Sequence, residues 1–222
     1  MTGALAERSL TLPAPSDRSD LSTFLGHVTR LDAAAVVRLR RRAPDHVVAW
    51  CETGFDVLAT RAVRGSLQPA DVTVAADGLR ALLAGAGSAP FDPGFAMDSA
   101  WRGPVPGERA DGFVHVEDIP GPVLVDLAER GVALAREHGG EHGPPTSLLD
   151  QTVLTARSAD ESVDIPMRMV FALNAMKFVP GEDSDDRVRV RLHRSWVRLD
   201  ARYGSVVRAR GASIPLMVTR GR

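Results

Sequence analysis

The stretch "RVRVRLH", residues 187–193, alternates arginine with valine or leucine and ends in a histidine. Successive side chains of a β-strand point to opposite faces, so the alternation predicts a strand with its aliphatic residues in a core and its arginines outside. Arg187, Arg189 and Arg191 then form one row, about 6.8 Å apart along the strand. One buried and one polar face is typical of a strand in an antiparallel sheet.

The remaining chain mixes further strand patterns with helical ones. Three β-rich runs between residues 34 and 65 are separated by short turns, which predicts an antiparallel meander, and residues 152–165 predict a hairpin. Apolar residues recur at helical spacing in four segments, residues 19–31, 75–85, 118–138 and 166–178. The predicted fold class is α+β, with antiparallel sheets packed by helices and two halves of similar make-up.

The segment 195–208 fits two structures. Trp196, Leu199 and Tyr203 match a helix that is capped by Ser195, whereas Gly204 and the β-branched residues allow a strand. The helix is the favoured interpretation here.

Composition changes along the chain predict its organisation. Residues 1–18 lack periodicity and are expected to form a disordered tail, and residues 19–85 form a first unit. Residues 86–111 are rich in glycine and proline and predict a long connecting loop. Residues 112–222 form a second unit, which can also share one domain with the first.

The composition excludes several classes of protein. The chain has 222 residues, of which 44% are hydrophobic and 25% charged, as in ordinary globular proteins. It has neither a run of about 18 apolar residues nor a signal-peptide pattern at its start, so a cytoplasmic location is expected. Cys51 is the single cysteine, which excludes an internal disulfide and CxxC sites.

Known catalytic motifs are missing. "GAGSAPFDPG" resembles a dinucleotide fingerprint but has Pro90 where the third glycine belongs, and no P-loop, GxSxG or HExxH pattern occurs. His138 and His142 flank Gly139-Gly140, where a helix should end, so they are expected to point apart rather than to share a metal. We therefore expect no metal and no cofactor.

Two weaker candidates for chemistry remain. His115 and Glu117 are two residues apart in a predicted strand, on one face, and with Trp101 of the long loop they could line a pocket. Cys51 would need a cationic neighbour to be a nucleophile, but His46 is five residues away on the opposite face of its strand. We expect Cys51 to be a buried apolar residue.

Positive charge is concentrated at the C-terminal end. Residues 187–222 contain ten arginines and one acidic residue, Asp200, a net charge of +9, so the first 186 residues carry −10 to give the total of −1. The candidate contacts for an anion or nucleic acid are Arg187, Arg189, Arg191, Arg194, Arg198, Arg202 and Arg208. The favoured interpretation is that carboxylates of the same assembly, such as those of "EDSDD" at 182–186, pair with them.

Three segments, "RLDAAAVVRLRRR", "FDVLATRAV" and "WVRLDARYGS", resemble a family of uncharacterised actinobacterial proteins of similar length. The resemblance covers most of residues 20–210. It implies no activity, because its motifs are not catalytic signatures.

These observations favour a cytoplasmic binding or scaffold protein that is not an enzyme and that acts through protein–protein contact or self-association. The alternative is nucleic-acid binding through the C-terminal arginines. The third interpretation is an enzyme of a class that the motifs above do not cover.

Overall fold

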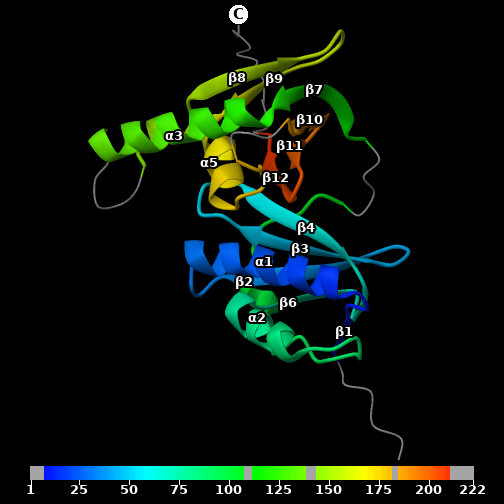
Figure 1. The fold of residues 1–222 in the computed structure, drawn as a ribbon. Coiled ribbons are helices and arrows are strands. Elements are labelled where there is room, and N and C mark those ends of the chain that lie inside the picture. The colour runs from blue at the N-terminus through cyan, green and yellow to red at the C-terminus, as the bar shows by residue number, and fades with distance from the viewer. Residues whose placement is uncertain (1–7, 108–111, 139–143, 182–184, 211–222) are drawn as a thin grey trace, which may run out of the picture.

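A computed structural model describes residues 8–107, 112–138, 144–181 and 185–210 of the chain (Figure 1). Its strands are β1 (Ser9–Thr11), β2 (Val36–Arg42), β3 (His46–Glu52), β4 (Leu58–Arg64), β5 (Ser66–Gln68), β6 (Asp71–Ala75), β7 (Val114–Pro120), β8 (Thr152–Arg157), β9 (Ser162–Pro166), β10 (Arg187–His193), β11 (Trp196–Ala201) and β12 (Gly204–Ala209). Its helices are α1 (Pro15–Leu31), α2 (Ala76–Gly85), the 3-10 helix η1 (Asp98–Ala100), α3 (Gly121–His138), α4 (Thr146–Leu149) and α5 (Met167–Ala175). The predicted α+β class is confirmed.

One antiparallel sheet of eight strands spans both halves of the chain in the order β6-β2-β3-β4-β12-β11-β10-β7. The first four strands come from the N-terminal half and the last four from the C-terminal half. Aliphatic side chains of these strands and of the helices form a single buried core on one face of the sheet. This core explains the alternation of residues in β10, because Val188, Val190 and Leu192 are buried in it.

The helical interpretation of residues 195–208 is wrong. These residues form β11 and β12, which pair with each other and place Leu199 opposite Val206. Both of these side chains are fully buried. The pairing partners on either side, β10 and β4, decide the conformation, because strand propensity depends on the neighbours that a strand packs against.

The ordered chain also begins earlier than the expected tail boundary at residue 18. Strand β1 pairs with β5, with Leu10 opposite Leu67, and α1 begins at Pro15. Leu10 and Leu12 are fully buried, so apolar contacts with the core hold this segment in place. Residues 1–7 lie outside the described part of the chain.

The two halves meet where β4 pairs with β12. Three residue pairs make this contact, with Ala59 and Val206 at its centre. Next to it the ring of Phe24 from α1 stacks on that of Phe178, which follows α5, with 6.3 Å between centroids. Gly204 allows the Phe178 ring to pack directly on β12, because a Cβ at this position would lie 2.5 Å from the ring. The core is therefore continuous across the junction.

A buried arginine also links the halves. Arg168 is 7% exposed on α5, and its Nη1 donates a 2.7 Å hydrogen bond to the carbonyl oxygen of Phe55 in the β3–β4 turn. The same side chain contacts Asp150 of its own half at 2.5 Å and Asp56 of the other half at 3.6 Å. Its charge is thus compensated by both halves, as a buried charge requires.

The connection between the halves crosses the sheet on the face opposite the core. It begins along the edge strand β6, where the Met97 amide donates to the Thr73 carbonyl oxygen at 2.7 Å. It then passes over β2, where the Trp101 ring lies 6.0 Å from the guanidinium carbon of Arg38. None of the described helices is long and apolar enough to span a membrane.

Replacing Arg168 should weaken the junction. We expect Arg168→Met to lower the free energy of unfolding by about 2–3 kcal/mol, because the Phe55 carbonyl and the charged partners lose their donor. Urea denaturation measures the change. Arg130→Met is the control, since Arg130 is on the exposed face of α3 and pairs with Asp126 alone among the described residues, and it should cost about 0.5 kcal/mol. Equal losses for the two variants would show that Arg168 does not link the halves.

Cys51 should be unreactive in the folded protein. It is fully buried on β3, and burial raises the pKa of its thiol to about 12. The thiolate is the reactive form, so we expect a thiol reagent at neutral pH to label Cys51 only as fast as the protein unfolds. The measurement is the labelling rate with and without urea. Rapid stoichiometric labelling of the folded protein would contradict the burial.

Candidate anion-binding site

The sheet face opposite the core carries arginines from both halves. Residues that pair across antiparallel strands share a face, and the register places Arg38, Trp50, Thr60, Ser205, Asp200 and Arg189 in one row across six strands. The row continues onto β7 with Asp118. Arginines and aspartates therefore lie next to each other on this face.

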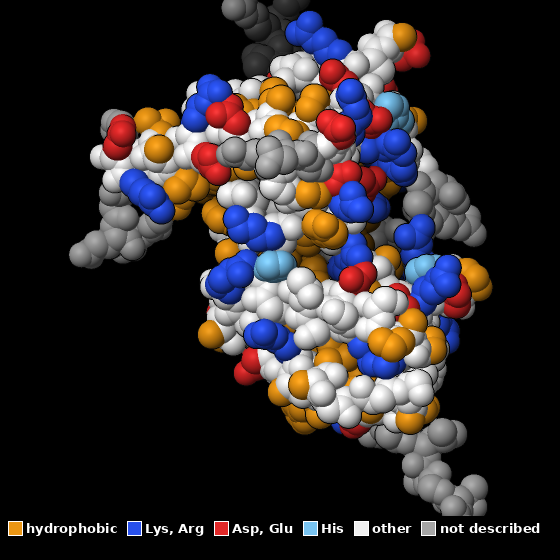
Figure 2. All heavy atoms as spheres, viewed as in Figure 1, with side chains coloured by type: hydrophobic (Ala, Val, Ile, Leu, Met, Phe, Trp, Pro, Cys, Tyr) orange, Lys and Arg blue, Asp and Glu red, His pale blue; other side chains and the backbone are white. Residues whose placement is uncertain are grey.

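Most of the C-terminal arginines are ion-paired. The pairs are Arg189–Asp118 at 3.2 Å, Arg191–Asp200 at 3.1 Å, Arg198–Asp200 at 2.5 Å, Arg202–Asp186 at 3.2 Å and Arg208–Asp56 at 3.7 Å. Arg187 and Arg194 have no carboxylate partner within the part of the chain that the structure describes. Figure 2 shows basic and acidic side chains interspersed on the upper half of the face in view, rather than a field of one sign.

A cavity of about 230 Å³, here called the junction pocket, lies where the two halves meet. It is lined by Arg40, Arg41, Arg42, Val48, Trp50, Thr60, Arg61, Ala62, Pro106, Gly107, Phe113, Arg198, Ala201, Gly204 and Ser205. These residues come from β2, β3, β4, β11 and β12 and from the segment that joins the halves. No acidic residue is among these lining residues.

Three of the five pocket arginines are held by carboxylates outside the pocket. Arg61 pairs with Asp20 of α1, and the Nε of Arg40 lies 3.1 Å from Asp71. Arg198 is bound by Asp200 and donates a further 3.1 Å hydrogen bond to the Ser205 hydroxyl. Arg40 and Arg198 lie on the face of the sheet that forms the pocket, whereas the side chain of Arg61, which pairs in register with buried Ala49 and binds Asp20 of α1, lies on the core face.

Arg41 and Arg42 are different, because they make no side-chain ion pair or hydrogen bond with the described residues. Both are exposed, or nearly so, at the end of β2. Thr60 is only 5% exposed, and its hydroxyl has no hydrogen-bond partner in the described chain. Arg42 lies on the same face of β2 as Arg40, which is the face of the pocket, whereas Arg41 pairs with Val47 on the core face. One cation without a carboxylate among the described residues therefore faces the pocket, and the Thr60 hydroxyl is buried in its wall.

The pocket contains residues that were not predicted as site residues. The run "RRR" at 40–42 was predicted only as part of a strand of the meander, and the candidate arginines all follow residue 186. The available signal was the spacing of Arg40 and Arg42, which share one face of the strand and repel each other unless an anion lies near. Arg198 is the one candidate residue that the structure brings into the junction pocket.

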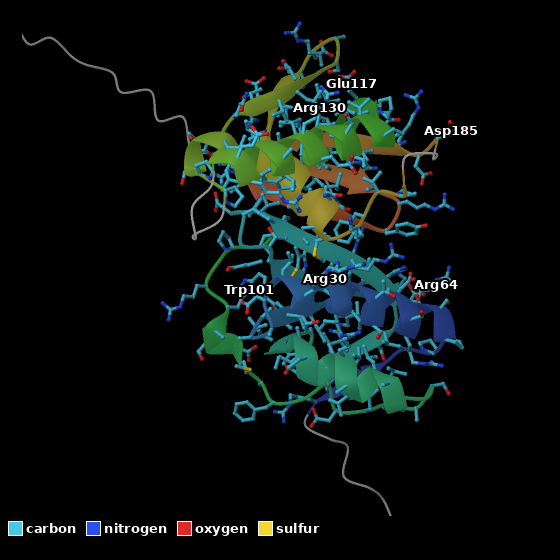
Figure 3. All side chains as sticks on the ribbon, turned by 60° about the vertical axis from the view of Figure 1, so that its left-hand side comes forward. Arg30, Arg64, Trp101, Glu117, Arg130 and Asp185 are labelled. Carbon is cyan, nitrogen blue, oxygen red and sulfur yellow. The ribbon has the colours of Figure 1, made fainter. Side chains whose placement is uncertain are left out.

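The structure does not bring Trp101, His115 and Glu117 together. Trp101 lies over β2 and donates its indole N–H to the Gly103 carbonyl oxygen at 2.7 Å, whereas the other two are on β7 at the opposite end of the sheet. Figure 3 shows Trp101 beside the N-terminal half and Glu117 at the top of the molecule.

His115 and Glu117 also do not share a face. A register shift in β7 pairs Glu117 with Val190 and His115 with Arg191, whose side chains lie on opposite faces. His115 instead contacts Asp118 at 2.9 Å, and Glu117 accepts a hydrogen bond from the Arg157 amide of β8. A β-bulge cannot be read from residue spacing, which explains this error.

No cluster of three potential metal ligands occurs among the described residues. Residues 139–143 and the side chain of His138 lie outside the described part of the chain. That His138 and His142 point apart therefore stays a prediction.

The edge contact at Asp118 should make stability depend on pH. Hydrogen bonds from Arg189 and His115 lower the pKa of Asp118, so the folded state favours its carboxylate. This stabilisation is present above the unfolded pKa of about 3.9 and is lost as the pH falls through the lower pKa of the folded state. We expect Asp118→Asn to be less stable than the wild type above pH ~5, with the difference shrinking below pH ~4. Urea unfolding across this range measures it, and a constant difference would contradict the assignment.

The two halves of the chain match two different protein families, one on each side of the connection. Residues 5–103 match a domain of unknown function (DUF8010), and residues 109–213 match a second domain of unknown function (DUF8185). No curated protein matches the sequence.

Solved structures of bacterial sliding clamps share the fold. The pol III beta protein of Caulobacter crescentus superposes with a TM-score of 0.55 at 14% identity, over 90% of this chain and 64% of that chain. A putative DNA polymerase III beta subunit of Eubacterium rectale gives 0.57 at 8% identity, over 91% and 64%. A DNA polymerase sliding clamp of Pseudomonas aeruginosa gives 0.56 at 14% identity, over 94% and 65%. The chain thus joins two regions that match domain families of unknown function, on a fold similar to about two-thirds of a sliding clamp.

Proposed function

We propose that the protein is a binding or scaffold protein without enzymatic activity, which acts through contact with a protein partner or with a second copy of itself. The observation that carries the proposal is the ion pairing of its C-terminal arginines on a fold similar to that of sliding clamps. Pairing within the chain lowers the positive potential that a polyanion would meet on this surface, which favours a protein partner over a nucleic acid.

Nucleic-acid binding is less well supported by the charges. Protein surfaces that bind a nucleic-acid backbone carry an excess of lysine and arginine, because each neutralised phosphate contributes to affinity. Here Asp118 and Asp200 neutralise arginines on the face opposite the core, and Asp186 pairs with Arg202 in the β11–β12 turn. The helices are no more basic, since α1 carries two aspartates and two arginines, and α3 carries three acidic residues and two arginines.

An exposed apolar patch supports a protein partner. Phe95 is 80% exposed in the connection, and Leu82 of α2 is 45% exposed. The two belong to neighbouring segments, since a Cβ on Gly94 would lie 4.0 Å from a methyl carbon of Leu82. Large exposed aromatic side chains of this kind often anchor protein interfaces.

Sedimentation velocity tests whether this patch mediates self-association. We expect the protein to associate reversibly, and Phe95→Ser to weaken the association at least about tenfold, as loss of an interface anchor does. Tyr203→Ser is the control, because Tyr203 is 48% exposed but lies in the β11–β12 turn.

Heparin chromatography provides the second readout. We expect elution below physiological salt, about 0.15 M. Retention at that salt that is lost when Arg187, Arg189 and Arg191 become serine would favour nucleic-acid binding instead. A monomer at all concentrations would exclude self-association and leave a different protein as partner.

A further inference from the structure

We infer that the junction pocket binds the carboxylate of an organic acid that carries an apolar group beside its acid group. This inference goes beyond the proposed scaffold role and does not depend on it, because the pocket has no residue in common with the exposed patch at Phe95 and Leu82. The carboxylate would meet Arg42, and the apolar group would lie on the floor of the pocket.

Three arginine side chains lie on the sheet face that forms the pocket. Arg40 and Arg42 are two residues apart on β2, so their side chains point to the same face. Arg198 of β11 contacts Asp200 and the Ser205 hydroxyl, which belong to the row of residues on that face. The cavity therefore receives guanidinium groups from both halves of the chain.

One of these three arginines is available to a ligand. Asp71 holds Arg40 and Asp200 holds Arg198, and neither aspartate lines the cavity. Arg42 has no carboxylate partner among the described residues. A single guanidinium group binds a single carboxylate through two parallel, charge-assisted hydrogen bonds. The pocket thus suits an anion with one negative charge.

The pocket remains positive although two of its arginines are paired, because their aspartates are shared. Asp71 also accepts two hydrogen bonds of 2.8 Å from Arg38, and Asp200 also contacts Arg191 at 3.1 Å. Each aspartate can therefore neutralise only one of the two arginines that it contacts. The remaining positive potential attracts an anion to the cavity.

Apolar side chains form the floor of the cavity. Val48 of β3 pairs with Ala62 of β4, and Trp50 is two residues from Val48 on the same face. Pro106 and Phe113, between the two halves, also line the cavity. Its volume is about 230 Å³, below the roughly 300–1,000 Å³ of typical ligand sites. One ring or a short aliphatic chain, with its carboxylate, therefore suits this space.

Calorimetric titration of the full chain with phenylacetate tests the inference. We expect saturable binding at one site, at least about tenfold tighter than that of phenylacetamide, which has the same ring and nearly the same shape but no charge. Equal binding of the two compounds would contradict the role of the carboxylate. Absence of saturable binding of phenylacetate would overturn the inference as a whole.

Two adjacent arginines provide a matched pair of variants. Arg42→Gln should lower the affinity for phenylacetate about tenfold, because it removes the guanidinium group that binds the carboxylate. Arg41→Gln removes the same charge one residue away, but Arg41 pairs with Val47 on the core face, so the affinity should stay nearly unchanged. Both side chains are exposed, so neither variant should lose stability in urea denaturation. Equal losses of affinity would overturn the inference.

Ala62→Trp tests whether the ligand occupies the cavity. Ala62 is exposed on the pocket floor, so a larger side chain fits the folded protein while it fills the cavity. We expect phenylacetate binding to be lost and the midpoint of urea unfolding to be unchanged. Binding that persists in this variant would place the acid outside the pocket and would contradict the inference.

A short peptide identifies the source of the carboxylate. The probe has two alanines followed by a C-terminal phenylalanine, which presents a ring beside a free carboxylate. Tighter binding of this peptide than of phenylacetate assigns the site to the C-terminus of a protein, and weaker or equal binding assigns it to a small acid. The same peptide with an amidated C-terminus should not displace phenylacetate. Displacement by the amidated peptide would overturn the inference.

Discussion

The pairing of β4 with β12 is the contact on which the molecule depends. Only three residue pairs make it, yet it joins four strands of each half into one sheet and makes one core possible. The stacked rings of Phe24 and Phe178 and the buried Arg168 reinforce it on the core side. On the other side of the sheet the same contact creates the junction pocket, because β4 runs on beyond Thr60 while β12 begins at Gly204.

Charge pairing decides which parts of the arginine-rich surface can meet a ligand. Exposed pairs such as Arg202–Asp186 contribute little stability but reduce the field that a nucleic acid would meet. The pocket differs because Asp71 and Asp200 hold Arg40 and Arg198 without lining the cavity themselves. A surface that is nearly neutral as a whole can therefore still contain a small cationic cavity.

Local patterns predicted most elements, and long-range contacts explain the failures. The meander, α2, the long helix after residue 120 and β10 follow from periodicity, because each buries one face. Residues 195–208 form strands because β10 and β4 lie ready to pair with them, although Trp196, Leu199 and Tyr203 are spaced as in a helix. His115 and Glu117 lie on opposite faces because of a bulge. Which strands pair with a segment, and in which register, cannot be inferred from the residues of that segment alone.

The sequence by itself determined the α+β class, the alternating faces of the strands, the absence of the main catalytic motifs and the burial of Cys51. All of these depend on residue type and short-range spacing. Only the tertiary structure decided which arginines are neutralised, and that Arg40 and Arg42 line one cavity with Arg198, more than 150 residues away in the chain. The physical reason is that charge compensation and cavity formation depend on distances of a few ångströms between segments that the sequence separates widely.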